Sequence, residues 1–107
     1  MGNIRKISGR ELRKMLKDRF PPLLIDVRSR RDFRKGHIGG SKNIPIEKFK
    51  DTIKKIKPDL NSSIVVYCKC GIKSAKASHI LKKMGFKKIY NLGGIENWHH
   101  RLKRWFH

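Results

Sequence analysis

The apolar residues of the chain fall into short runs typical of strands and into wider spacings typical of helices. Leu23–Val27, Ile64–Tyr67 and Lys88–Leu92 predict strands, and the β-branched run Ile64–Tyr67, bounded by turn residues, is the strongest of them. Ile4–Ile7 predicts a short first strand. Strands that alternate with helices indicate an α/β fold with a parallel sheet and helices on both faces.

Four apolar stripes predict amphipathic helices. They are formed by Leu12, Met15 and Leu16; by Ile46, Phe49, Ile53 and Ile56; by Ala77, Ile80, Leu81 and Met84; and by Trp98, Leu102 and Trp105. Ser8 and Glu11 form a capping box ahead of the first stripe. Ser29 and Asp32 repeat this signal, which predicts a further short helix toward Lys35.

Proline and glycine predict where two other segments lie. Ile44 and Ile46 flank Pro45, and they predict a short edge strand because proline has no N–H to donate to a central ladder. Gly93 and Gly94 predict a turn directly after the last strand.

The length of 107 residues predicts a single domain that spans residues 1–107. The longest apolar runs, Pro21–Ile25 and Ile64–Cys68, are far too short to cross a bilayer. The N-terminus has no apolar segment of the kind found in secretory signals, so we expect a cytoplasmic protein with no membrane segment. We also expect a monomer.

Positive charge is the strongest bias in the composition. Twenty-eight Lys and Arg face eight Asp and Glu, which gives a formal net charge of +20. This charge indicates either a surface for nucleic acid or an acidic partner, or a bias spread over all solvent faces. The basic residues run from Arg5 to Arg104 without a single cluster, which favours the second interpretation. Non-specific binding to polyanions is expected in both cases.

The C-terminal segment interleaves histidines with large aromatic residues. These are Trp98, His99, His100, Trp105, Phe106 and His107. Interleaved aromatic and basic side chains can bind nucleic acid by stacking. The apolar spacing favours instead a helix that packs on the core.

The candidate chemistry lies in the segment Val65–Ser74. Cys68 ends the central predicted strand, and a helix is expected to begin near Ser74. Ligands of open parallel sheets bind at the carboxyl ends of strands, and a helix N-terminus offers N–H groups and the positive end of a dipole. With Lys69 and Lys73 nearby, we expect a lowered pKa for the Cys68 thiol and a nucleophilic role toward anions. The alternative is a buried structural cysteine.

The two cysteines do not predict a disulfide scaffold or a metal centre. Cys68 and Cys70 are one residue apart, so a disulfide between them would close a tiny loop. A structural zinc site needs four ligands, usually from spaced pairs of Cys or His. We therefore expect no metal and no cofactor.

Five segments follow one another in a specific order and spacing: Leu24–Arg28, Phe33–Ile38, Asn43–Pro45, Val65–Cys68 and Asn91–Ile95. Together they resemble the rhodanese family of sulfurtransferases, in its single-domain form. The resemblance covers the chain from about Ile7 to Trp98. It implies a rhodanese-like fold, with a five-stranded parallel sheet between helices, and a sulfur carried as a persulfide on Cys68. It also implies thiosulfate or a persulfide as donor, and cyanide or a thiol as acceptor.

The loop from Cys68 to Lys73 has six residues, which is similar to sulfurtransferases. Related phosphatases and arsenate reductases have a longer loop that ends in arginine. A shorter loop makes a narrower cradle, which suits one terminal sulfur better than a tetrahedral phosphate. The resemblance therefore implies that Cys68 is catalytic and that substrate is bound by Lys69, Cys70, Gly71, Ile72 and Lys73. Arg28 follows a strand end and is a further candidate; pairing with Asp26 or Asp32 is the alternative.

Two positions depart from the family pattern. Lys73 stands where relatives often have arginine, and a lysine is a point charge without the bidentate fork. We therefore expect poorer orientation of an oxyanion and weaker thiosulfate turnover. Cys70 stands where many relatives lack sulfur, and it is either a resolving thiol that attacks a Cys68 persulfide or a spectator.

Three functions remain open from the sequence. The first is a sulfurtransferase enzyme that uses Cys68. The second is a sulfur-carrier or docking module for RNA or an acidic protein partner. The third is a dithiol redox protein that uses Cys68 and Cys70.

Overall fold

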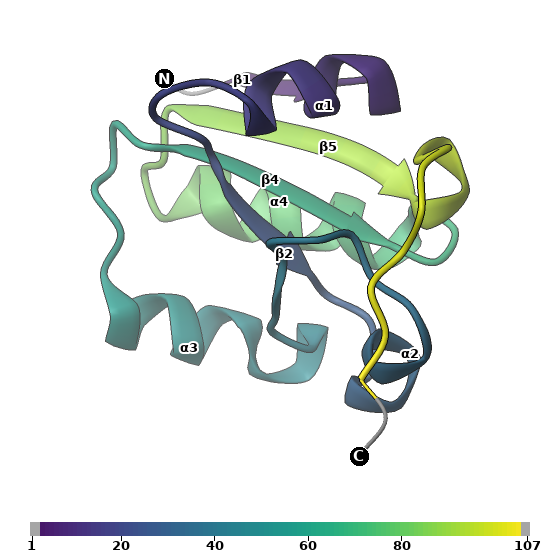
Figure 1. The fold of residues 1–107 in the computed structure, drawn as a ribbon. Helices are drawn as coiled ribbons and strands as arrows, with labels where there is room; N and C mark the ends of the chain where they lie inside the picture. The colour runs from purple at the N-terminus through teal and green to yellow at the C-terminus, as the bar shows by residue number, and fades with distance from the viewer. Residues whose placement is uncertain (1–2, 106–107) are drawn as a thin grey trace.

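The computed structural model describes residues 3–105 and contains a five-stranded sheet with helices on both faces (Figure 1). Every neighbouring pair of strands is parallel, so the predicted fold class is confirmed. The elements are β1 (Asn3–Lys6), α1 (Gly9–Leu16), β2 (Leu23–Asp26), α2 (Arg30–Lys35), β3 (Lys42–Asn43), η1 (Ile46–Lys48), α3 (Phe49–Ile56), β4 (Ser63–Cys68), α4 (Ile72–Lys83), β5 (Lys88–Gly94) and η2 (Ile95–Asn97).

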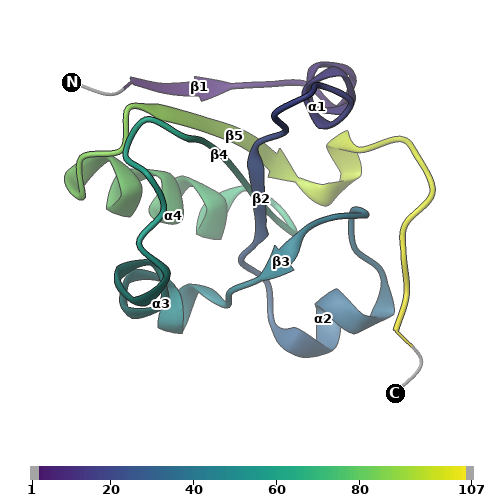
Figure 2. The same cartoon turned by 60° about the vertical axis from the view of Figure 1, so that its left-hand side comes forward.

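The strand order is β1-β5-β4-β2-β3, so β4 lies at the centre of the sheet (Figure 2). Side chains of β4 alternate between the two faces, as the period of two in a strand requires. Ile64, Val66 and Cys68 join one hydrophobic cluster, whereas Val65 and Tyr67 join the other. Cys68 is the last residue of β4, and this alternation directs its side chain to the face that α4 covers.

Two layers of helix cover the sheet. Phe49 and Ile53 of α3 and Leu81 of α4 pack on one face. Leu12 of α1 packs on the other face, together with Leu102 from the C-terminal segment. Among the described residues, no helix is both long and apolar enough to cross a bilayer.

The helix starts agree with the predicted caps. The Ser8 hydroxyl accepts a hydrogen bond from the Glu11 N–H, and the Glu11 carboxylate accepts one from the Ser8 N–H. The Ser29 hydroxyl accepts from the Asp32 N–H in the same way at the start of α2. Each bond satisfies an N–H that a helix start would otherwise leave unpaired.

The prediction of a C-terminal helix is wrong. After η2, Trp98 is extended, and the Lys103 N–H and C=O pair with the backbone of His37 in an isolated antiparallel bridge. Trp105 packs edge-on against Phe33 of α2. A helix here would stack the like charges of residues 99–104 along its surface, which destabilises it, whereas the extended chain covers α2. Phe106 and His107 lie outside the described residues.

Two strand boundaries also differ from the prediction. The edge strand β3 is Lys42–Asn43 rather than Ile44–Ile46. The Ile44 and Ile46 N–H groups still donate to the carbonyls of Asp26 and Val27, whereas Pro45 has no N–H to donate. The predicted turn at Gly93 and Gly94 is instead the end of β5, where an irregularity in the pairing with β4 accommodates them.

Candidate active site

A tight loop joins β4 to α4 and encloses the thiol of Cys68. Gly71 lies just before the helix with a φ of 97°, a left-handed conformation that glycine adopts without strain. The Gly71 and Ser74 N–H groups donate to Cys68 Sγ at 3.0 and 3.3 Å. The helix begins at Ile72, two residues earlier than predicted, and it therefore starts inside the loop.

The loop changes the acidity of the Cys68 thiol. Burial, with only 1% of the residue exposed, raises its pKa. Hydrogen bonds from the Ser74 side chain and from the N–H groups of Ser74, Gly71 and Cys70 lower it by more, so the pKa lies below its ordinary value. The thiolate fraction at neutral pH is correspondingly larger than for a free cysteine. The expected lowering is thus present, and its main causes are hydrogen-bond donors rather than the lysine charges.

The predicted substrate-binding residues of the loop lie around the buried thiol. Lys69, Cys70, Ile72 and Lys73 are exposed, and Gly71 is half-buried. Cys70 and Cys68 are both free thiols, one exposed and one buried. The loop thus presents its side chains outward while its N–H groups point inward to sulfur.

Arg28, in contrast, is bound to residues other than those of the loop. Its guanidinium donates to both carboxylate oxygens of Asp26, with Nη2 at 2.8 Å from Oδ2, and to the Gly36 carbonyl. The Arg28 N–H also donates to Asp26 Oδ1 at 2.8 Å. Both residues are buried. The structure therefore bears out the pairing with Asp26, and the described contacts of Arg28 include no hydrogen bond to the loop.

Two residues of the site were missed by the sequence analysis. Ser74 is fully buried, and its N–H donates to Cys68 Sγ. Its hydroxyl donates to the Gly71 carbonyl at 3.1 Å and also lowers the pKa of the Cys68 thiol. Its position at the predicted helix start was the signal that could have identified it. A Cβ on Gly94 would lie 2.7 Å from the Lys69 carbonyl oxygen, so only glycine lets β5 pass under the loop. In the sequence, the Gly93-Gly94 pair was the feature that could have indicated this close approach.

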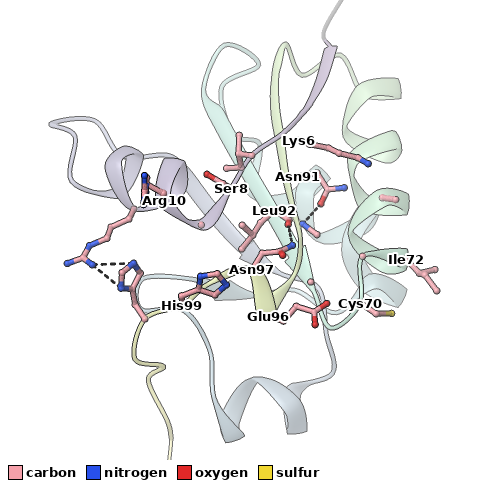
Figure 3. A pocket seen from close by; sticks show the side chains of 18 residues that line it. Lys6, Ser8, Arg10, Cys70, Ile72, Asn91, Leu92, Glu96, Asn97 and His99 are labelled. Carbon is pink, nitrogen blue, oxygen red and sulfur yellow. Dashed lines mark hydrogen bonds between the residues drawn. The ribbon is translucent and has the colours of Figure 1, made fainter.

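An open groove of about 1420 Å³ borders the outer side of the loop (Figure 3). Its walls come from the start of α1, the end of β5 with η2, and the loop residues Cys70, Gly71 and Ile72. Cys68 lies beneath this wall and does not line the groove.

Comparisons with known proteins agree with the fold and the site. The sequence matches the Rhodanese-like domain family over residues 8–101. It is 37% identical over 73 residues to thiosulfate sulfurtransferase PspE of Escherichia coli, covering 68% of this chain and 70% of that protein. It is 35% identical over 99 residues to a tRNA uridine(34) hydroxylase of Protochlamydia amoebophila, covering 86% of this chain but only 31% of that protein.

A solved structure described as rhodanese with anions from E. coli superposes with a TM-score of 0.72 at 32% identity. The match covers 78% of this chain and 98% of that one. The family match, the parallel sheet and the enclosed thiol at the end of β4 lead to the same conclusion: the chain belongs to the Rhodanese-like domain family of sulfurtransferases.

Proposed function

We propose that the protein moves sulfane sulfur from thiosulfate or a persulfide donor to a thiol or cyanide acceptor through a persulfide on Cys68. The observation that carries this proposal is the contact of Cys68 Sγ with the N–H groups of Gly71 and Ser74. Fixed backbone donors stabilise a negative charge on sulfur without rearranging during the reaction. Backbone N–H groups of this kind also suit a bound anion.

The proposed reaction has two steps. In the first, the Cys68 thiolate attacks the outer sulfur of thiosulfate, a new S–S bond forms, and sulfite leaves with the bonding electron pair. In the second, an acceptor thiolate attacks the outer sulfur of the persulfide and Cys68 leaves as a thiolate. The donors that lower the pKa of the thiol favour this departure, because a thiol of lower pKa leaves faster.

Lys69 and Lys73 are exposed beside the loop and supply the positive charge that attracts an anionic donor. Neither matches the bidentate arrangement that a guanidinium offers to two oxygens. A sulfonate would therefore be attracted but poorly oriented. This favours a persulfide donor, which needs no such orientation, over thiosulfate.

The test is the intact mass of the protein after treatment with thiosulfate or polysulfide. We expect the addition of one sulfur atom, which cyanide or a reductant removes. Cys68→Ser should abolish the adduct and Cys70→Ser should retain it. An adduct that survives Cys68→Ser and is lost in Cys70→Ser would overturn the assignment of the nucleophile. A requirement for both thiols would favour the dithiol redox alternative.

A further inference from the structure

Basic side chains line the groove beside the loop. Lys6 from the end of β1 and Arg10 and Arg13 from α1 supply its positive charge, and Glu96 adds one acidic side chain. His99 and His100 follow η2, and His100 Nδ1 accepts a hydrogen bond from Arg13 Nη1 at 2.9 Å. These basic residues are far apart in the sequence, and the fold brings them to the same groove as the active-site loop (Figure 3).

The groove is held in place by close packing and by hydrogen bonds between asparagine side chains and the backbone. A Cβ on Gly9 would overlap the Asn97 carbonyl oxygen, so α1 begins directly against η2. The Asn97 side-chain amide donates to the Leu92 carbonyl at 2.8 Å. The Gly93 N–H donates to the Asn91 side-chain oxygen at 2.8 Å. A preformed groove of this kind requires little ordering when a partner binds.

The size of the groove exceeds what the sulfur donor needs. Pockets for drug-sized molecules measure about 300–1,000 Å³, and thiosulfate is far smaller than such a molecule. The groove is about 1420 Å³ and open to solvent. It therefore suits an extended segment of a larger partner, which would run past the loop that covers Cys68.

The side chains of the groove favour a protein segment over nucleic acid. Ile72 is 77% exposed on the loop wall of the same groove. A peptide with acidic and apolar side chains can pair with both, whereas a phosphate backbone leaves Ile72 without an apolar contact. Among the described residues, the groove lining includes no phenylalanine, tyrosine or tryptophan on which a base can stack.

We propose that this groove docks an acidic protein segment that carries an apolar side chain and belongs to the partner that receives sulfur from Cys68. The inference rests on the proposed function for the identity of the partner as the acceptor. Charge complementarity steers the segment into the groove, and Ile72 sets its position relative to the loop. The docked partner then presents its thiol at the loop rather than diffusing to it freely.

Binding can be measured without any sulfur chemistry in the Cys68→Ser protein. The probe is a fluorescein-labelled peptide of alternating glutamate and leucine, followed by fluorescence anisotropy. We expect Lys6→Gln with Arg10→Gln to weaken binding about tenfold, because two groove charges are lost. Ile72→Ser should weaken it about threefold to fivefold. A matched double variant, Lys54→Gln with Lys55→Gln on the exposed side of α3, loses the same charge and should change binding less than about twofold.

Equal weakening in the two double variants would overturn the proposal, since it would show attraction by net charge alone. An unchanged affinity in Ile72→Ser would overturn the proposed peptide position. Single-stranded oligouridine that binds more tightly than the peptide, with the same dependence on Lys6 and Arg10, would replace the protein partner with nucleic acid. Intact mass after thiosulfate treatment, measured in the same variants with Cys68 restored, tests the proposed function separately, because peptide binding does not require a persulfide.

Discussion

The ends of β2 and β4 lie side by side in the sheet, and each carries an ionisable side chain. At the end of β2, the Asp26 carboxylate is bound by the guanidinium and N–H of Arg28. At the end of β4, the groups within residues 3–105 that bind Cys68 Sγ are all hydrogen-bond donors of its own loop. The guanidinium of Arg28 neutralises the Asp26 carboxylate. The Cys68 thiolate is instead stabilised by hydrogen bonds from uncharged groups.

This difference supports the proposal that chemistry takes place at the β4 end and not at the β2 end. The Asp26–Arg28 pair is buried, and it also ties the strand end to the Gly36 carbonyl, so it holds the β2 end in shape. Backbone donors add no side chain that blocks the thiol. In the proposed mechanism, the geometry of the loop, rather than a charged partner residue, therefore sets the reactivity of Cys68.

The largest expected effect is on stability at the β2 end. Asp26→Asn leaves the buried Arg28 without its counter-ion, which typically costs about 3–5 kcal/mol of unfolding free energy. Cys68→Ser should change that free energy by no more than about 1 kcal/mol. Urea unfolding of both variants measures the contrast. Similar losses in the two would show that the β4 end is as structural as the β2 end.

The next effect is on the loop itself. Gly71→Ala forces a side chain into the left-handed conformation at a cost of about 1–2 kcal/mol, and the loop can relieve this strain by turning its N–H away from sulfur. The pKa of Cys68 then rises, and its alkylation by iodoacetamide at neutral pH slows. Gly40→Ala is the matched control: its φ is 86°, and a Cβ there meets no atom within 4 Å. Equal slowing of alkylation in Gly40→Ala would contradict the role of the Gly71 N–H.

The smallest effect concerns the exposed cation at the end of the loop. Lys73→Ala should lower thiosulfate turnover about twofold to fivefold, because an exposed charge contributes weakly. Lys73→Arg should match or exceed the parent, since a guanidinium orients oxyanions better. Lys76→Ala, on the same helix, is the control. Turnover in Lys73→Ala equal to the parent would make Lys73 a solvated surface residue.

Much of the fold follows from local signals in the sequence. The capping box of Ser8 and Glu11 forms as expected, and the run Ile64–Tyr67 lies in the central strand. These signals act over a few residues and need no knowledge of the rest of the chain. The position of Cys68 at a strand end follows in the same way.

The errors arise where distant contacts decide the conformation. The stripe of Trp98, Leu102 and Trp105 has helical spacing, yet pairing with His37 and packing on Phe33 hold the segment extended. Gly93 and Gly94 predict a turn from the sequence, whereas in the fold the missing side chain of Gly94 permits the close approach of the Lys69 carbonyl. The sequence predicts Ser74 only as a helix start, because its contact with sulfur depends on how the loop folds back.

The most direct test is the pH dependence of Cys68 alkylation in the Cys70→Ser protein, where a single thiol reacts. The alkylation rate rises as the thiolate forms, so the midpoint of the profile reports the pKa independently of access to the buried sulfur. The same protein unfolded in urea supplies the reference midpoint. Because the loop donors lower the pKa of Cys68 despite its burial, the folded midpoint should lie below the unfolded one, and Ser74→Ala should raise it. A folded midpoint at or above the unfolded one would contradict the account.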